Sequence, residues 1–431
     1  MQKIRITGGK KLSGRVKIGG AKNAASKMMI ASLLTDEKVT LSNIPLQQET
    51  DIAKELVGMV GAHTEIQDHL LTLHAEKITS TSTLALTRKN RLSILLAAPL
   101  LHRAGEATIV KLGGDKIGPR PVDFHLGALQ RMGAVVKETK DGVHFSVEGR
   151  LKGVSLELPY PSVMATETIL LAGVLAEGRT VLKNAAIEPE IIDLIMMLQK
   201  MGAIIKTGAG REIEIIGVEH LHGCEHTVLP DRLEVASFAC LALATRGEIF
   251  CEGAHHHDLI TFLNAVRMVG GEWEAKPDGI LFRGSDHYHG IQLETDTYPG
   301  FSTDWQQPFV VVMTQAEGTS VVHETVWQER FAYVDSLIAM GADITMFTNC
   351  LGELPCRFKD QNYKHSAVIK GPTKLHAQKL TVPDIRAGLA YIAAALVADG
   401  VSEIDGVEHL ERGYENLFGK LKEIGADIEV E

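Results

Sequence analysis

The chain has few cysteines, few aromatic side chains and no long apolar run. Five cysteines among 431 residues are too few for a disulfide-stapled secreted fold, which favours a reduced, cytoplasmic protein. No stretch of ~18 apolar residues is present, so we expect no membrane span. Residues 1–9 include basic side chains but no apolar segment, and we therefore expect no signal peptide.

Positive charge is also in deficit. The formal net charge is -10 at pH 7, whereas a nucleic acid-binding surface would need a basic excess. Hydrophobic residues make up 45% and charged residues 23% of the chain, which is ordinary for a globular protein and excludes disorder, collagen and coiled coil. We expect small-molecule partners rather than nucleic acid or membrane. At ~150 residues per domain, the length alone suggests about three domains.

One signature recurs six times along the chain. An amphipathic helical segment ends in an apolar residue, a glycine and a small residue, and a strand-like segment follows, as in RMGAVVKE and KMGAIIKT. The glycine is expected to supply a left-handed C-cap at the end of each helix. The intervals between the glycines are 72, 69, 68, 71 and 84 residues. The glycines are Gly61, Gly133, Gly202, Gly270, Gly341 and Gly425.

A second signature precedes five of these glycines by 23 to 28 residues. An apolar, Ala/Leu-rich helix ends in glycine, and a short strand follows. The first unit has the same kind of helix, AASKMMIASLL, without the glycine. These helices are apolar nearly all round and should be buried, whereas the helices of the first signature should lie outside. The prediction is therefore an α/β protein of six repeated units. The second glycines are Gly105, Gly178, Gly247, Gly318 and Gly400.

Two turn motifs and one insertion modify the repeat. Asp141-Gly142 and Asp278-Gly279 predict β-hairpins. The longest interval carries about a dozen extra residues in the stretch 345–380. This stretch holds Cys350 and Cys356, and a surface insertion is favoured over a metal site because no paired ligands accompany the two cysteines. The run 255–258, HHHD, is interpreted as a solvated helix start rather than a metal cluster.

The starts of the buried helices carry an unusual set of cations. A helix N-terminus attracts anions through its unpaired N–H groups and its dipole, yet Lys22, Arg91 and Arg386 stand there. Repeated cations at equivalent helix starts indicate that the starts converge on an anionic ligand. The alternative role for polar residues at these positions is helix capping. N-caps are predicted at Ser162, Asp231, Asp304 and Asp384.

The remaining glycine-rich segment, at 113–119, matches neither the P-loop nor the dinucleotide-binding pattern. It is interpreted as a mobile loop that carries charge. No HExxH, GxSxG or CxxC pattern is present in the sequence.

Five segments in chain order resemble one enzyme family. They are GGAKNAA at 19–25, GPRPVD at 118–123, EPEI at 188–191, LPDR at 229–232 and RGY at 412–414. Together they are similar to the UDP-N-acetylglucosamine 1-carboxyvinyltransferase family of enolpyruvyl transferases, over essentially the whole chain. This sequence resembles the shikimate-pathway enolpyruvyl transferases less, because their first signature segment is Gly-Asp-Lys-Ser-like and differs from GGAKNAA.

The resemblance implies a two-domain inside-out α/β barrel, the enolpyruvyl transferase fold, with three units in each domain. One domain would span residues 22–229 and carry a mobile loop at about 111–121. The other would comprise residues 1–21 and 230–431, with the active site in the cleft between the two domains.

The family reaction moves the enolpyruvyl group of phosphoenolpyruvate to the 3'-hydroxyl of UDP-N-acetylglucosamine and releases phosphate. It opens peptidoglycan precursor synthesis, and thereby serves cell shape and division. No cofactor and no metal is implied. The resemblance assigns phosphoenolpyruvate to Lys22, Asn23, Arg120, Arg330, Arg386 and Arg412. It assigns the UDP-sugar to Asn23, Arg91, Arg120, Pro121, Val122, Asp123, Phe124, Tyr160, Pro161, Ser162, Val163, Asp304 and Val326.

Two carboxylates are implied as the proton carriers. Asp304 matches the family base for the sugar hydroxyl. Asp115 stands where most members have a cysteine as general acid, and a carboxyl group needs a raised pKa to donate a proton at neutral pH. Lys22 and Arg412 complete the catalytic set. Because a carboxylate is a poorer nucleophile than a thiolate, insensitivity to fosfomycin, the epoxide that alkylates the family cysteine, is expected.

Two positions depart from the family pattern. Met164 stands where glycine is usual, close to the expected diphosphate site, and Gln48 stands where some members have lysine. These departures leave open two alternatives: the same chemistry on a different nucleotide or sugar acceptor, and a catalytically weak paralogue that binds UDP-sugar as a regulator.

Overall fold

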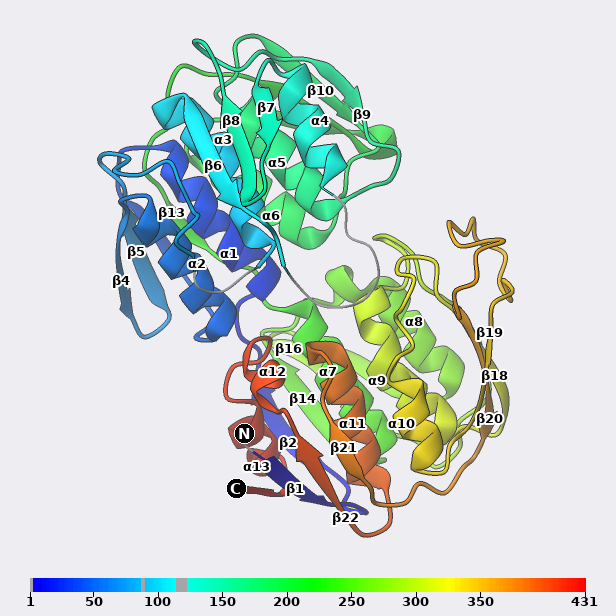
Figure 1. Ribbon diagram of the computed structural model, residues 1–431. Coiled ribbons are helices and arrows are strands. Elements are labelled where there is room, and N and C mark those ends of the chain that lie inside the picture. The colour runs from blue at the N-terminus through cyan, green and yellow to red at the C-terminus, as the bar shows by residue number, and fades with distance from the viewer. Residues whose placement is uncertain (1–2, 87–89, 114–121) are drawn as a thin grey trace. The chain divides into compact units, whose positions relative to one another are not determined.

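The computed structural model describes residues 3–86, 90–113 and 122–431, and Figure 1 shows their path. These residues divide into two compact units. The middle unit comprises the described residues between 20 and 229, and the terminal unit comprises residues 3–19 and 230–431. Each unit has its own hydrophobic core. No helix of the described residues combines the length and the apolar character that a bilayer crossing requires.

The helices of the middle unit alternate between a buried and an outer set. The inner helices α3 and α5 pack on each other, and the short helix η2 contacts α1, α3 and α5. The inner elements are α1 (Lys22–Ala31), η1 (Ser32–Leu34), η2 (Leu92–Leu96), α3 (Ala97–Ala104) and α5 (Val163–Gly173). The others are α2 (Gln48–Met59), α4 (Asp123–Arg131), α6 (Pro189–Lys200) and η3 (Ala209–Arg211).

The terminal unit repeats this arrangement. Helices α7, α9 and α11 pack on one another, and every residue of α7 is buried. The inner helices are α7 (Arg232–Ala244), α9 (Thr303–Thr314) and α11 (Ile385–Val397). The others are η4 (His256–Leu259), α8 (Ile260–Val269), α10 (Val334–Ala339), α12 (Glu408–Glu411) and α13 (Leu417–Glu423). The predicted division into buried and half-exposed helices is thereby confirmed in both units.

Six small sheets carry the strands of the described residues, three in each unit. In five of them one short strand runs parallel to its neighbour, and the other pairs in the sheet are antiparallel. A buried helix makes the crossover that parallel pairing requires in the sheet of β9 and β10 and in that of β17 and β18.

The strand bounds follow the repeat. The middle unit contains β3 (Val39–Ser42), β4 (His63–Gln67), β5 (Leu70–His74), β6 (Glu106–Val110), β7 (Val135–Glu138), β8 (Gly142–Ser146), β9 (Ser155–Glu157), β10 (Arg179–Lys183), β11 (Ile204–Gly208), β12 (Glu212–Ile216) and β13 (Glu225–Thr227). The terminal unit contains β1 (Lys3–Thr7), β2 (Ser13–Lys17), β14 (Glu248–Glu252), β15 (Glu272–Lys276), β16 (Gly279–Arg283), β17 (Gln292–Glu294), β18 (Gly318–His323), β19 (Asp343–Phe347), β20 (Ser366–Gly371), β21 (Lys379–Thr381), β22 (Val401–Asp405) and β23 (Asp427–Val430).

Strand pairing explains why the first residues of the chain belong to the terminal unit. Strand β1 lies between β22 and β23 and is antiparallel to both. Strand β2 runs parallel to β14, far along the chain. Strand β13 pairs in the same way with β3. Each unit is therefore completed by a strand that stands before the first helix of the other unit in sequence.

The predicted glycine caps and hairpins are confirmed. The six glycines of the first signature all have a positive φ, between 94° and 108°, as a left-handed helix end requires. Strands β7 and β8 form one predicted hairpin, and β15 and β16 form the other. Gly247 behaves differently, because its φ is not positive and Arg246 takes the left-handed conformation instead, with φ 53°. A Cβ at Gly247 would lie 1.9 Å from the carbonyl oxygen of Leu12.

The insertion forms a long connection between β19 and β20. Residues 348–365 contain no helix or strand, whereas β15 and β16 are joined by a tight turn. The histidine run at 255–258 begins η4, and its histidines are exposed. His255 and His257 flank Asp258 at 3.6 and 3.7 Å.

Candidate active site

The start of α9 presents a carboxylate that takes no part in capping the helix. The N-cap of α9 is Ser302, whose hydroxyl accepts a hydrogen bond from the backbone N–H of Asp304. The prediction that Asp304 caps the helix is therefore wrong, since it is the second residue inside α9. The caps predicted at Ser162, Asp231 and Asp384 are confirmed, because each side chain accepts a backbone N–H in the first turn.

Two buried arginines bind the carboxylate of Asp304. Arg330 Nη2 contacts Oδ1, and Arg386 Nε lies 3.5 Å from Oδ2. The two arginine side chains are 4% and 7% exposed, whereas the Asp304 side chain is 28% exposed. Arg330 precedes α10, and Arg386 is the second residue of α11. Two guanidinium groups from separate elements thus converge on one partly accessible carboxylate.

Tyr414 holds Arg386 from the other side. Arg386 Nη1 donates to the phenolic oxygen of Tyr414 at 2.7 Å, and that oxygen also lies 2.9 Å from Ser237 Oγ on α7. The guanidinium carbon of Arg386 lies 5.4 Å from the centre of the Tyr414 ring. Burial raises the pKa of Tyr414, so the phenol stays protonated. Arg412 follows α12, two residues before this tyrosine.

Arg330 is supported by the buried polar residues behind it. With its amide oriented to satisfy both of its groups, Gln307 accepts from Arg330 Nε at 2.6 Å and from Nη2 at 3.2 Å. Glu324 is fully buried, and burial raises its pKa although the charge of Arg330 opposes this shift. The arginine is thereby held with its charge directed to Asp304.

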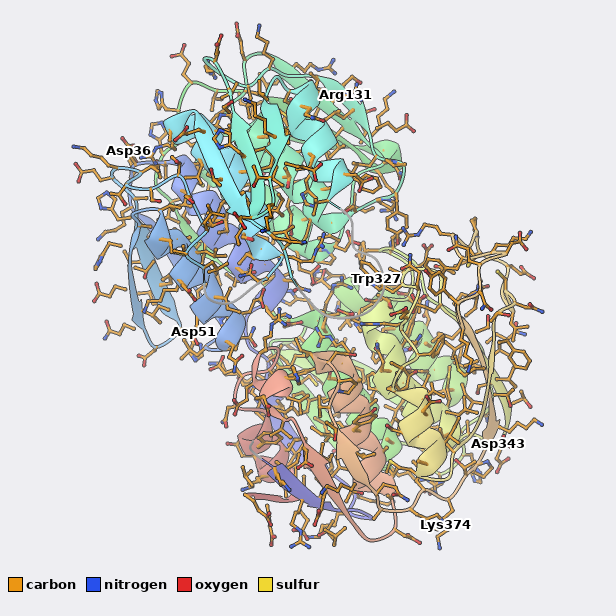
Figure 2. All side chains as sticks on the ribbon, viewed as in Figure 1. Asp36, Asp51, Arg131, Trp327, Asp343 and Lys374 are labelled. Carbon is orange, nitrogen blue, oxygen red and sulfur yellow. The ribbon has the colours of Figure 1, made fainter. Side chains whose placement is uncertain are left out.

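Glu324 organises the chain around the start of α9. Its Oε1 accepts the backbone N–H groups of Val326 and Trp327, at 2.8 and 3.0 Å. Its Oε2 accepts from Thr303 Oγ1 and Gln306 Nε2, at 2.9 and 3.1 Å. Trp327 therefore lies near the first residues of α9. Lys374 lies near the opposite, C-terminal end of the same helix (Figure 2).

We expect Glu324→Ala to destabilise the terminal unit by about 3 kcal/mol, because four donors lose a buried acceptor and such groups cost ~1–3 kcal/mol each when unsatisfied. Urea unfolding followed by tryptophan fluorescence measures the effect. Glu317→Ala, an exposed position on the same unit, is the control and should change stability little. Equal midpoints for the two variants would contradict the role given to Glu324.

In the middle unit, the predicted cations stand at helix starts. Lys22 and Asn23 are the first residues of α1, whose N-cap, Ala21, offers no side-chain hydrogen bond. Arg91 directly precedes η2, and the carbonyl oxygen of the Asn90 side chain caps that helix by accepting from Ser93 N–H at 3.1 Å. An alanine at the N-cap therefore contributes no capping side chain to the start of α1.

The expected nucleotide residues flank α4 and α5. Val122 precedes α4, and Asp123 and Phe124 begin it. His125 of α4 is hydrogen-bonded to Thr168 of α5, at 2.7 Å between Nδ1 and Oγ1. Burial, together with the charge of Arg91, lowers the pKa of His125 to about 3. The remaining members precede or begin α5: Tyr160, Pro161, Ser162 and Val163.

Three predicted site residues cannot be placed. Asp115, Arg120 and Pro121 lie outside the described residues, as does most of the glycine-rich segment. Val326 belongs to the terminal unit, where its carbonyl oxygen accepts from Arg357. Met164 is the second residue of α5 and packs in part against the core, and Gln48 begins α2.

A buried acidic group lies beside the motif at 188–191. Glu167 of α5 is fully enclosed, and its Oε2 has no hydrogen-bond partner among the described residues. Burial raises the pKa of Glu167 to about 8, with Glu188 and Glu190 adding to the shift and Lys27 opposing it. This carboxyl group is therefore protonated at neutral pH.

We expect Glu167→Gln to gain stability relative to wild type as the pH rises from 5 to 8. Between the ordinary pKa of 4.5 and the folded value of about 8, the folded wild type binds one proton more than the unfolded chain, so its stability falls by ~1.4 kcal/mol per pH unit. Denaturant unfolding at several pH values measures the difference. Glu177→Gln, at an exposed position, serves as control, and a stability difference that does not change with pH would contradict the protonated state.

Sequence reasoning missed the residues that hold the arginines. Tyr414 stands in the RGY motif at 412–414, from which the resemblance assigns a role to Arg412 alone. Glu324 and Gln307 carry no spacing signal, because their role depends on contacts between α9 and the end of β18. The sequence also showed no sign that two histidines lie close to Cys350 and Cys356, a cluster that is described below.

The chain was compared with known protein families and with curated relatives. The model of the EPSP synthase (3-phosphoshikimate 1-carboxyvinyltransferase) family matches residues 6–421. The UDP-N-acetylglucosamine 1-carboxyvinyltransferase of Protochlamydia amoebophila is 47% identical, with 99% of this chain and 94% of that protein covered. The enzymes of the same name from Chlamydia muridarum and Granulibacter bethesdensis are 44% and 40% identical, with at least 98% of each chain covered.

Solved structures confirm the predicted fold class. The enolpyruvyl transferase NikO from Streptomyces tendae has a TM-score of 0.88 at 23% identity, covering 100% of this chain and 99% of that one. EPSP synthase from Acinetobacter baumannii has a TM-score of 0.75 at 18% identity, with both chains fully covered. At these identities the likeness concerns the fold alone.

Proposed function

Because the chain belongs to the enolpyruvyl transferase family and, within it, to the UDP-N-acetylglucosamine 1-carboxyvinyltransferases, we propose that it transfers the enolpyruvyl group of phosphoenolpyruvate to the 3'-hydroxyl of UDP-N-acetylglucosamine and releases phosphate. The chain is therefore a transferase. The product would enter peptidoglycan precursor synthesis.

The observation that supports this proposal best is the pair of arginines on Asp304. Arg330 and Arg386 both bind one carboxylate, which is the group that phosphoenolpyruvate presents beside its phosphate. A guanidinium group suits a carboxylate because its donors form a planar fork. We assign the carboxylate of phosphoenolpyruvate to these two arginines. The phosphate is assigned to Lys22, Arg120 and Arg412.

Asp304 is the proposed general base. It accepts the proton of the sugar hydroxyl while that oxygen forms a bond to C2 of phosphoenolpyruvate, and Asp115 gives a proton to the methylene carbon. Loss of a proton from that carbon and departure of phosphate then restore the double bond. Asp304 lies inside α9 rather than at the N-cap, so its carboxylate oxygens are available to the arginines and to the substrate. Arginines that hold Asp304 also fix its orientation.

The UDP-sugar is assigned to the middle unit. Arg91, the start of α4 and the segment before α5 provide a cation, backbone N–H groups and aromatic surface. Helix starts suit a diphosphate because unpaired N–H groups and the dipole favour anions there. We propose that both units contribute residues to the one reaction, in domains of residues 22–229 and of 1–21 with 230–431.

Phosphate release with phosphoenolpyruvate and UDP-N-acetylglucosamine tests the proposal. The purified chain should release phosphate only when both substrates are present, and mass spectrometry should show the UDP-sugar heavier by one enolpyruvyl group. The same protein without acceptor is the control. Binding of UDP-N-acetylglucosamine without any phosphate release would instead support the regulatory paralogue.

Met164 favours one alternative, namely a different acceptor. Its side chain stands in the first turn of α5, where the resemblance implies that glycine is usual, and a bulky group there would obstruct close approach of the backbone to the diphosphate. Turnover with a panel of nucleotide sugars separates the two readings. If UDP-N-acetylglucosamine has the highest kcat/KM, the acceptor is as proposed, whereas a higher value for another nucleotide sugar replaces it.

A further inference from the structure

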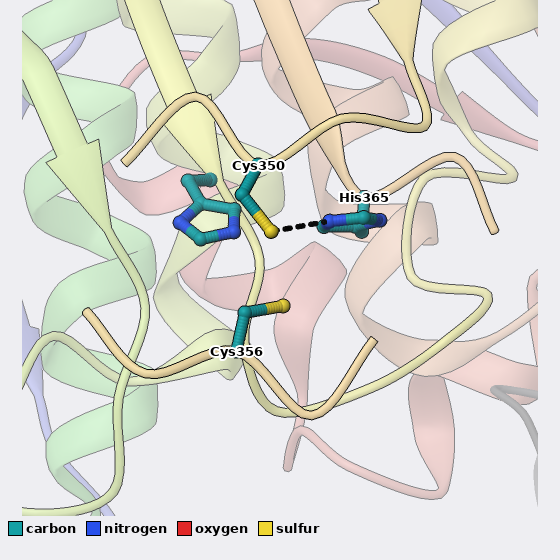
Figure 3. Close-up of side chains that lie close together, drawn as sticks. Cys350, Cys356 and His365 are labelled. Carbon is teal, nitrogen blue, oxygen red and sulfur yellow. Dashed lines mark hydrogen bonds between the residues drawn. The ribbon is translucent and has the colours of Figure 1, made fainter. Parts of the chain in front are cut away.

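Four metal-binding side chains meet in the terminal unit, apart from the residues assigned to the reaction. One donor atom each from His323, Cys350, Cys356 and His365 lies within 4.8 Å of the other three. Figure 3 shows the two thiols and the His365 ring directed toward one another. Cys350 Sγ lies 3.4 Å from His365 Nε2. Nothing in the proposed reaction uses this cluster.

The fold brings the four residues together from three places. His323 ends β18, and His365 directly precedes β20. These strands are antiparallel, with His323 opposite Ser366, so the two histidines are neighbours at one end of the sheet. The two cysteines come from the insertion at 348–365, which folds back over that end. Ser366 fastens it further, since its Oγ donates to Asn349 and accepts from Leu351 N–H.

His365 faces Cys350 through Nε2, and the Nδ1 atom of each histidine is taken by an acceptor outside the cluster. His323 Nδ1 lies 2.9 Å from Glu294 Oε2, and His365 Nδ1 lies 2.8 Å from the carbonyl oxygen of Tyr363. A carboxylate and a carbonyl only accept hydrogen bonds, so each Nδ1 carries the hydrogen, and in the neutral imidazole each Nε2 then offers a lone pair. This is the usual tautomer of a metal-bound histidine, whose other nitrogen donates to a carboxylate or carbonyl.

A buried atom without a partner marks the centre of the cluster. His323 is 0% exposed, and its Nε2 has no hydrogen-bond partner among the described residues. Such an orphaned acceptor is costly unless a ligand satisfies it. The carboxylate of Glu294 is itself held by the backbone N–H groups of Glu353 and Leu354, at 2.9 Å each. The insertion thus supports both the ligands and their outer contacts.

The donor set identifies the metal. Two thiolates and two imidazoles form the tetrahedral S2N2 set that is typical of structural zinc. Donors in such a site stand ~3.3–3.8 Å apart, given Zn–N of ~2.0 Å and Zn–S of ~2.3 Å. The distance between Cys350 and His365 already has this value, and a contraction of about 1 Å brings the widest pair into range.

We propose that His323, Cys350, Cys356 and His365 bind one Zn²⁺ that fastens the insertion to the end of the β18–β20 sheet. Four protein ligands leave no open position, so the metal is structural rather than catalytic. His323 is the neighbour of Glu324, whose carboxylate organises the start of α9. The zinc therefore supports the segment that carries Val326 and, through Glu324, the helix start that carries Asp304.

Metal analysis of the full chain tests the site. Protein purified with a reductant, then supplied with Zn²⁺ and dialysed against a weak chelator, should retain about one zinc per chain. The double variant Cys350→Ser/Cys356→Ser should retain less than a tenth of that amount. Cys224→Ser, at a half-buried cysteine of the middle unit, is the matched control and should retain zinc as wild type does. Equal zinc in the double variant and wild type would overturn the proposal.

Cobalt substitution separates a built site from an adventitious ion. Co²⁺ in place of Zn²⁺ should give the visible absorption of tetrahedral cobalt and a near-ultraviolet thiolate charge-transfer band, both absent from the double variant. Circular dichroism of the double variant checks that it has folded. Octahedral cobalt spectra in wild type, or a Cys350–Cys356 disulfide found by peptide mass spectrometry in place of bound metal, would also overturn the site.

Thermal unfolding shows whether the metal stabilises this unit. A strong chelator should lower the melting temperature of wild type by several degrees, added Zn²⁺ should restore it, and the double variant should respond to neither. A wild-type melting temperature indifferent to the chelator would contradict the structural role. These readouts do not depend on turnover, so they stand apart from the test of the proposed reaction.

Discussion

Replacing Asp304 by asparagine is expected to lower kcat by about 10²–10⁴-fold, the usual contribution of a general base. The change removes the proton acceptor and keeps the size of the side chain. It also removes the negative charge that Arg330 and Arg386 bind in this structure. The steady-state rate of phosphate release with both substrates measures the loss.

Asp335→Asn is the matched control for this variant. Asp335 is an exposed residue of α10 in the same unit, and the same chemical change there should leave kcat within about twofold of wild type. Thermal unfolding of the two variants verifies that both are folded, so that the loss of kcat in Asp304→Asn does not come from misfolding. A kcat for Asp304→Asn within a few-fold of wild type would remove Asp304 from the role of base.

Replacing Asp115 by alanine is expected to reduce turnover nearly to background, because no group then protonates the methylene carbon. Wild type should keep its full rate during incubation with fosfomycin. Asp115→Cys should instead lose activity with time in the presence of fosfomycin, since a thiolate is the better nucleophile toward an epoxide. Rates after timed preincubation measure both effects.

Peptide mass spectrometry identifies the alkylated residue in the Asp115→Cys variant. The adduct should be on residue 115, and the five native cysteines should remain unmodified, as they should in wild type treated in parallel. Time-dependent inactivation of wild type, or normal turnover of Asp115→Ala, would contradict the assignment of Asp115 as the acid.

The repeat could be predicted because each of its signals is local. The glycines that end the outer helices, such as Gly133 and Gly270, need a positive φ, which few other residues adopt easily. Helix α7 could be predicted as buried because it is apolar nearly all round. The cations Lys22, Arg91 and Arg386 could also be predicted to stand at helix starts, because the position of a residue relative to a helix depends on neighbouring residues alone.

The predictions that went wrong or fell short depend on residues far apart in sequence. Asp304 resembles an N-cap, yet Ser302 takes that place, and arginines 26 and 82 residues further on bind the carboxylate instead. His365 lies in the same stretch of sequence as the two cysteines, but nothing in the spacing of the three residues indicates that their side chains meet. His323 joins them only because β18 pairs with β20.

The sequence by itself determined the number of repeated units, the inner and outer helices and the family. The tertiary structure decided which side chains meet: the two arginines on Asp304, Tyr414 behind Arg386, and two histidines with two cysteines. The physical reason is that helix periodicity and glycine caps arise from interactions over a few residues, whereas ion pairs and metal ligands depend on strand register and helix packing between distant segments.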